Sequence, residues 1–258
     1  MKNTTKLSFA LAAALLALPM TGFAQETEAA GEVAAAEEVA TDEVAAEEEA
    51  SIFSWNAAIA SDYVFRGVSQ NDEEAALQLG ADLNFESGFY VGAWASNVDF
   101  GAGGPDVEVD TYIGWNTDLS ERWNLDLMLN RYNYLGEQDG FGDGDYNEFI
   151  STLALDETYS FTFGYTNDVY NLDEDGFYYA LAGNWEIVNG VGLHVGIGRS
   201  TFDSATGIDD YTDWSVAVDR DFGPVNAALG FYGTDASGDD NFGEVADNRL
   251  VLSFSIGG

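Results

Sequence analysis

Charged side chains recur at every second position along several segments of this sequence, and they are the residues best suited to chemistry. Asp82 and Asp126 each lie between apolar neighbours, and Asp110 follows Val109 in the same period-two pattern. Such alternation is typical of strands with one apolar and one polar face. We therefore expect these side chains to project together to one side of a sheet and to line a pore. The full set predicted for this lining is Asp62, Arg66, Asp82, Glu108, Asp110, Asp126, Glu186, His194 and Asp219.

Other reactive groups are sparse. His194 is the only histidine and there is no cysteine. One histidine cannot build a zinc site by itself, and without cysteine there is no thiol nucleophile. Acidic clusters such as Asp173, Glu174 and Asp175 could in principle bind Ca²⁺. None has EF-hand spacing, and Asp and Gly favour solvated turns for backbone reasons. We therefore expect no cofactor, no metal and no enzyme activity, because no nucleophile, base and orienting group come together.

The hairpin spanning residues 77–97 shows the strand pattern most clearly. Leu79 and Leu83 belong to an apolar face that alternates with polar residues, and Gly88 allows a tight reversal because it takes positive φ without strain. Phe85 begins an aromatic cluster beside the turn. Such a cluster is typical of the point where a membrane strand meets lipid headgroups, although a sandwich edge can also carry one.

About twelve segments of this kind follow one another from residue 51 to the end, and their connections alternate between short turns and long polar loops. A β-sandwich has no reason to shorten every second connection, whereas a barrel threaded through a membrane does. Each segment is close to the ~9–11 residues that a tilted spanning strand needs. The sequence therefore predicts an all-β fold, an up-and-down antiparallel transmembrane β-barrel of about 12 strands.

The N-terminal part has a different composition. Lys2 and Lys6 precede a short apolar run and small residues at a cleavage position, so residues 1–24 are predicted to be a secretory signal peptide. Residues 25–50 are rich in Ala and Glu without aromatic or basic side chains, which favours a disordered acidic linker over a marginal helix. The barrel is expected to occupy residues 51–258.

The formal net charge is −38, and the sign of this charge limits the partners. A strongly acidic surface repels nucleic acid. An exported acidic barrel is expected in the cell outer membrane, where lipid surrounds it and small hydrophilic solutes or cations are its partners. The oligomeric state is left open.

Three stretches of sequence carry a resemblance to a known family. They are IASDYVFRGVSQ at 59–70, ESGFYVGAWASNVDF at 86–100 and VDTYIGW at 109–115. With them the chain resembles the TorF-like family of bacterial outer-membrane porins. The resemblance implies an outer-membrane barrel that passes small solutes and supplies no catalytic residues. The chain departs from such barrels in one respect. Outer-membrane barrels usually end in an aromatic residue on the last strand, whereas here the final aromatic side chain is Phe254 and the chain ends in Gly258.

The predicted function is a porin-like channel for passive passage of small hydrophilic solutes, with a preference for cations because inward carboxylates outnumber arginines. Two alternatives stay open. One is a closed structural or adhesive barrel, since twelve strands lie between filled eight-stranded and open sixteen-stranded barrels. The other is a secreted soluble β-protein that binds an apolar ligand, which would bury Leu79 and Leu83 inside.

Overall fold

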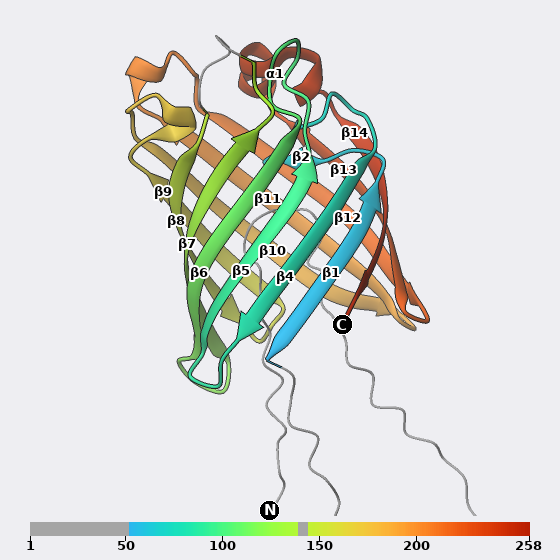
Figure 1. The fold of residues 1–258 in the computed structure, drawn as a ribbon. Coiled ribbons are helices and arrows are strands. Elements are labelled where there is room, and N and C mark those ends of the chain that lie inside the picture. Colours follow the sequence, from blue (N-terminus) through green and yellow to red (C-terminus); the bar gives the residue numbers. More distant parts are fainter. Residues whose placement is uncertain (1–51, 139–143) are drawn as a thin grey trace, which may run out of the picture.

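Twelve strands pair antiparallel with their neighbours all the way round and close into a barrel (Figure 1). The computed structural model describes residues 52–138 and 144–258, so the predicted signal and linker lie outside the described residues. Strand β1 closes the sheet against β14, with Ala57 opposite Ile256. The wall consists of β1 (Phe53–Ala60), β4 (Ala76–Asn84), β5 (Phe89–Asn97), β6 (Val107–Asp118), β7 (Trp123–Leu135), β8 (Tyr146–Leu155), β9 (Tyr159–Thr166), β10 (Gly176–Val188), β11 (Val191–Phe202), β12 (Tyr211–Phe222), β13 (Val225–Thr234) and β14 (Arg249–Gly257).

The predicted fold class, strand number and alternation of short and long connections are confirmed. The short turns include Asn189 and Gly190, whose φ angles of 33° and 73° give the left-handed pair that a two-residue hairpin needs. The long connections gather at the opposite end of the barrel (Figure 1). They carry η1 (Val169–Asn171), η2 (Ser204–Thr206), α1 (Ala236–Phe242) and η3 (Gly243–Ala246).

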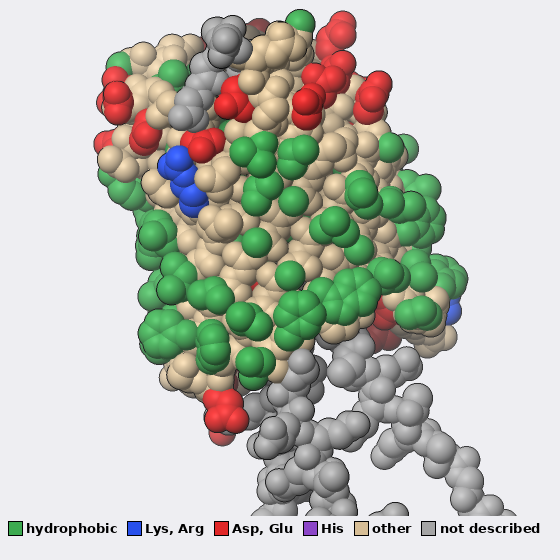
Figure 2. All heavy atoms as spheres, viewed as in Figure 1, with side chains coloured by type: hydrophobic (Ala, Val, Ile, Leu, Met, Phe, Trp, Pro, Cys, Tyr) green, Lys and Arg blue, Asp and Glu red, His purple; other side chains and the backbone are tan. Residues whose placement is uncertain are grey.

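The outer wall is apolar. Leu79 is 52% exposed and Ile197 53%, whereas the neighbouring Asp82 is only 8% exposed. Figure 2 shows hydrophobic side chains spread over the flank of the barrel, with acidic side chains gathered at the long-loop end. A soluble protein that binds an apolar ligand inside would bury Leu79 and Leu83, and the structure places both on the outside. No helix among the described residues is long and apolar enough to cross a membrane.

The first strand is shorter than the alternation predicted. If the alternation of residues 53–60 continued, Tyr63 and Phe65 would lie on the outer face, but β1 ends at Ala60, and Tyr63 is 2% exposed. Residues 61–75, here called the inward segment, fold into the lumen and contain the small hairpin of β2 (Val64–Phe65) and β3 (Val68–Ser69). The prediction failed because parity sets direction only while a strand remains paired within the sheet.

Inward glycines accommodate tyrosine rings. Tyr90 lies directly opposite Gly114 across β5 and β6, and Tyr112 lies directly opposite Gly92. A Cβ atom added at Gly114 would collide with the ring of Tyr90, and one at Gly92 would collide with the ring of Tyr112. The glycine-rich polar face therefore has a packing role, since it lets bulky rings lie flat against the wall.

We predict that Gly114→Val destabilises the barrel by about 1–3 kcal/mol, because it overpacks the site that the Tyr90 ring occupies. Combining it with Tyr90→Ala should recover much of that loss, giving a clear coupling energy in a double-mutant cycle measured by urea unfolding in detergent. Ala93→Val, on the outer face of the same strand pair, serves as the control. Additive effects of the Gly114 and Tyr90 substitutions would contradict this account.

Candidate functional site

Most of the predicted lining residues lie inside the barrel, and Glu186 does not. Asp62 and Arg66 lie on the inward segment, and four predicted wall residues are also buried. Glu186 lies at the rim of the short-turn end, where its carboxylate accepts a 2.9 Å hydrogen bond from the Gly190 N–H. His194 and Asp219 form a separate cluster near that end. The four buried wall residues are Asp82, Glu108, Asp110 and Asp126.

The inward segment crosses the lumen and contacts the wall on several sides. Its ordered position depends on both polar and apolar contacts, and these reach strands that lie far apart around the barrel. The contacts are Tyr63 with Glu108 on β6, Arg66 with Glu148 on β8, Val64 with Tyr232 on β13 and Val251 on β14, and Val68 with Tyr211 on β12. The segment therefore obstructs the passage in this conformation.

Arg66 makes the strongest of these contacts. Its Nη2 donates to both oxygens of Glu148 at 2.7 and 2.9 Å, and its guanidinium lies 4.0 Å from the ring centroid of Tyr178. Glu148 also accepts from the Tyr132 hydroxyl at 2.9 Å. Both charged side chains are largely excluded from water, with exposed fractions of 15% and 2%. Removal of either partner would leave a buried charge unpaired.

A second arginine fixes the start of the inward segment. Arg249 on β14 donates from Nη1 to Asp62 at 2.9 Å, and it also donates to the backbone carbonyls of Glu244 and Asp247. The other oxygen of Asp62 accepts from the Ser69 hydroxyl at 2.7 Å. The inward segment is thereby tied to the long-loop end of β14 and to η3.

Below this level, hydroxyl groups of inward tyrosines hold the wall carboxylates. Tyr112 donates to Asp82 at 2.6 Å and Tyr90 donates to Asp126 at 2.9 Å. Met128 packs with both rings and is only 1% exposed. On the other strands small inward residues are buried as well, namely Ala180, Ala217 and Ala228. The middle of the lumen is therefore filled by side chains.

The short-turn end holds a polar cluster around His194. Its Nδ1 lies 2.8 Å from Asn184 Oδ1 and its Nε2 lies 2.7 Å from Asp219 Oδ1. Asn226 donates to the second oxygen of Asp219 at 2.7 Å. Both ring nitrogens are thus used, and the cluster links β10, β11, β12 and β13.

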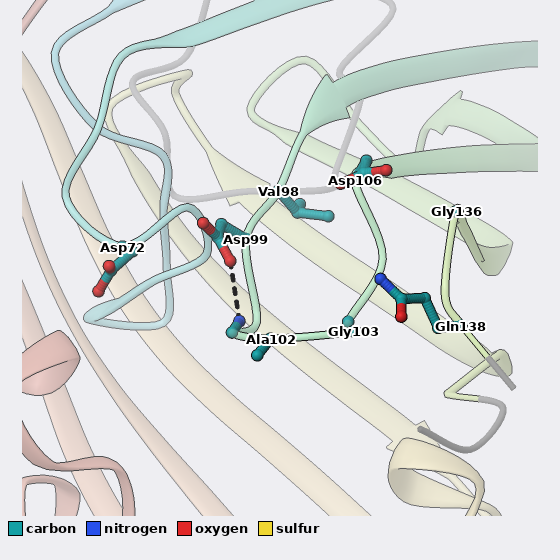
Figure 3. A pocket seen from close by; sticks show the side chains of 10 residues that line it. Asp72, Val98, Asp99, Ala102, Gly103, Asp106, Gly136 and Gln138 are labelled. Atoms are coloured by element: carbon teal, nitrogen blue, oxygen red, sulfur yellow. Dashed lines mark hydrogen bonds between the residues drawn. The ribbon is translucent and has the colours of Figure 1, made fainter. Parts of the chain in front are cut away.

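A hollow of about 380 Å³ lies at the long-loop end (Figure 3). The glycine-rich connection between β5 and β6 forms much of it, with Asp99, Asp106 and Gln138 around the opening and Asp72 of the inward segment to one side. Asp99 accepts from the Gly101 N–H at 2.8 Å. The mouth of the barrel is therefore acidic. Within residues 52–138 and 144–258, no three His, Cys, Asp or Glu side chains come together to hold a metal ion.

Sequence reasoning overlooked several interior residues. Glu148 and Asp213 are buried, and both have the parity opposite to their apolar neighbours, so the alternation could have identified them. Tyr132 and Tyr211 lie near the long-loop ends of their strands, where the aromatic side chains of a membrane barrel usually meet the headgroups, yet both are buried inside. Arg249 precedes the last strand's apolar pattern, and only its contact with Asp62 reveals its role. Polar hydroxyls let tyrosine serve on either face of a barrel, so residue type alone did not decide.

We predict that Arg66→Met lowers the free energy of unfolding by about 3–5 kcal/mol, because it leaves Glu148 buried without its partner. The double variant Arg66→Met with Glu148→Met should recover most of this loss. Urea unfolding in detergent, followed by tryptophan fluorescence, would measure both. A double variant no more stable than Arg66→Met would contradict the unpaired-charge account.

The matched control is the exposed pair at a short turn. Arg122 donates from Nε to Asp156 at 2.8 Å and also donates from Nη2 to the other oxygen of that carboxylate. These two hydrogen bonds hold the pKa of the Asp156 carboxyl below its usual value. Water screens this pair, so Arg122→Met should leave unfolding unchanged within error.

Comparisons with known proteins agree with the barrel architecture. A family model described as "Bacterial protein of unknown function (Gcw_chp)" matches residues 45–252. The structure is similar to the KdgM porin, with a TM-score of 0.51, 5% identity, and coverage of 79% of this chain and 98% of that one. It is also similar to the NanC porin, with a TM-score of 0.50, 10% identity, and coverage of 80% and 97%. No curated protein matched the sequence.

At these identities the likeness to solved structures concerns the fold alone. The resemblance to porins drawn from the sequence is thus supported at the level of the barrel. The narrower assignment to the TorF-like family is not supported, since the matching family model is a different one.

Proposed function

We propose that this chain, which belongs to the bacterial Gcw_chp family, is an outer-membrane barrel that passes small hydrophilic solutes when its inward segment leaves the lumen. Two solved structures that share the fold are named as porins. The apolar flank and the closed sheet meet the two demands of a bilayer. Lipid chains favour contact with apolar side chains, and the bilayer core offers no hydrogen-bond partners, so the protein must pair its own backbone groups.

The outer-membrane location can be tested with two leucines of similar exposure. Leu79 lies midway along the apolar flank and is 52% exposed, whereas Leu119 lies in a short turn and is 57% exposed. Leu79→Arg should destabilise the folded barrel in lipid by about 2–4 kcal/mol, because it places a charge near the bilayer midplane. Leu119→Arg should have no such effect. Equal tolerance of both substitutions, or a folded protein that stays in water without detergent, would exclude the membrane location.

One observation carries the proposed passage. The obstruction at the long-loop end is a connecting segment, and much of its attachment consists of hydrogen bonds and ion pairs that water can replace. Residues 61–75 also join strands that already pair at Ala60 and Ala76, so the wall does not need them to remain closed. A segment of this kind can leave the lumen without breaking the sheet.

Charge supports a preference for cations. Buried wall carboxylates outnumber the arginines that face the interior, which are Arg66 and Arg249, and the mouth carries further aspartates. In a narrow low-dielectric passage such an excess attracts cations and repels anions. The wall carboxylates are Asp82, Glu108, Asp110, Asp126, Glu148 and Asp213.

A closed structural barrel is the second candidate, because the burial of the inward side chains favours it. Met128, Asp110 and Asn130 are between 0% and 1% exposed, which leaves no room for water beside them. Under this alternative the barrel would act through its loops and never conduct.

Planar-bilayer recordings distinguish the two candidates. In the test variant a two-residue Asn-Gly turn replaces residues 61–75, so that only these two residues connect Ala60 to Ala76. We expect this variant to conduct steadily and the intact protein to conduct rarely, with a reversal potential of cationic sign in a salt gradient. Shortening the connection 203–210, which lies outside the lumen, should leave the intact behaviour unchanged.

Three results would contradict the proposal. A folded, membrane-inserted test variant that never conducts would show that the barrel is closed by its wall and structural in role. An equal conductance of the intact protein and the test variant would show that the inward segment does not control passage. A reversal potential of anionic sign would exclude cation preference.

A further inference from the structure

Two adjacent carboxyl groups on β6 lack a compensating positive charge. Glu108 and Asp110 stand two positions apart on the inward face of β6 and are 2% and 0% exposed. Arg66 and Arg249 are paired with other carboxylates, and no ion pair within residues 52–138 and 144–258 involves either group. Burial and like-charge repulsion both oppose ionisation of two neighbouring carboxyl groups that are removed from water.

The hydrogen bonds indicate which of the two groups is neutral. Glu108 accepts from the Tyr63 hydroxyl at 3.0 Å, as an ionised acceptor would. Asp110 accepts only from Asn130, whose Nδ2 lies 3.2 Å from Oδ2. Asp110 Oδ1 and Asn130 Oδ1 are both buried without a partner. A hydrogen on Asp110 supplies a donor where the described groups present only acceptors.

We propose that Asp110 carries a proton and that, with Glu108, it forms a proton-binding site beneath the inward segment. Several groups face this site and define its environment. Asn130 and Tyr134 approach from β7, and Glu148 approaches from β8 with Arg66 already bound to it. Tyr63 of the inward segment closes the site through its bond to Glu108.

The site couples to passage if the proposed function holds. Release of the inward segment would remove Tyr63 and admit water, and a hydrated carboxyl gives up its proton more readily than a buried one. By linkage, the proton then favours the closed form, and a rise in pH above neutrality favours the open form.

Infrared spectroscopy of the protein in lipid tests the site without reference to conductance. At neutral pH the intact protein should show the carbonyl band of a protonated carboxylic acid, and Asp110→Asn should remove it. Asp126→Asn is the matched control and should retain the band, because Asp126 is 1% exposed and accepts bonds at both oxygens from Tyr90 and Asn116.

The melting temperatures of the two variants should differ in sign. Asn at position 110 supplies the missing donor, so Asp110→Asn should melt at the same temperature as the intact protein or higher. Asn at position 126 keeps one accepting oxygen but sets an NH₂ group against the other existing donor, so Asp126→Asn should melt lower. Absence of the band, or its survival in Asp110→Asn, would overturn the proton site. A melting temperature that rises in Na⁺ or K⁺ over choline, without the band, would assign an alkali cation instead.

Conductance against pH tests the coupling. The open fraction of the intact protein should rise from neutral to alkaline pH, and that of Asp110→Asn should not change. A pH-independent intact channel would overturn the coupling while the infrared result still stands. A barrel that never conducts, even with residues 61–75 replaced, would refute the proposed passage and leave the proton site intact.

Discussion

Closure of the sheet is the constraint on which the rest of this structure depends. Because β14 pairs with β1, every wall strand has a neighbour on both sides, and no edge remains to attract another chain. Closure also divides the side chains into two sets by parity, one facing outward and one facing the lumen. The outward set is mostly apolar, and the buried carboxylates of the strands lie in a confined interior.

Confinement then determines how the interior is packed. A dozen strands enclose more space than small residues can fill, and this chain fills the space with tyrosine rings and with the inward segment. Each ring needs a flat place to lie, which the inward glycines provide, as Tyr90 does over Gly114. The hydroxyls of the same rings hold the carboxylates, as Tyr112 holds Asp82. Aromatic packing and charge burial are therefore parts of one arrangement.

Residues 61–75 are held by apolar contacts of Val64 and Val68 as well as by polar contacts, and the polar part distinguishes this interior from an ordinary core. An apolar core holds its parts by excluding water, and nothing else can substitute for that contact. Hydrogen bonds and ion pairs can be exchanged for bonds to water at little net cost, provided that every group is rehydrated. Under the proposed function the inward segment is stable in the lumen and can still be released, and the neighbouring Glu108–Asp110 site would make that release sensitive to pH.

The sequence by itself determined the parity of each strand and hence the barrel, the strand number, the alternating connections and the inward direction of Asp82, Glu108, Asp110 and Asp126. These follow from a period of two, which is a local property of the chain. Parity could also have identified Glu148, whose neighbour Phe149 faces outward.

Only the tertiary structure decided what happens where pairing stops. Beyond Ala60 no local rule directs Tyr63 or Arg66, and their places depend on Glu108 and Glu148, which follow 45 and 82 residues later in the chain. The filling of the lumen was equally beyond the sequence, because parity gives the direction of a side chain and not the distance to the opposite wall. That distance depends on how twelve strands tilt and close together, which is a property of the whole sheet.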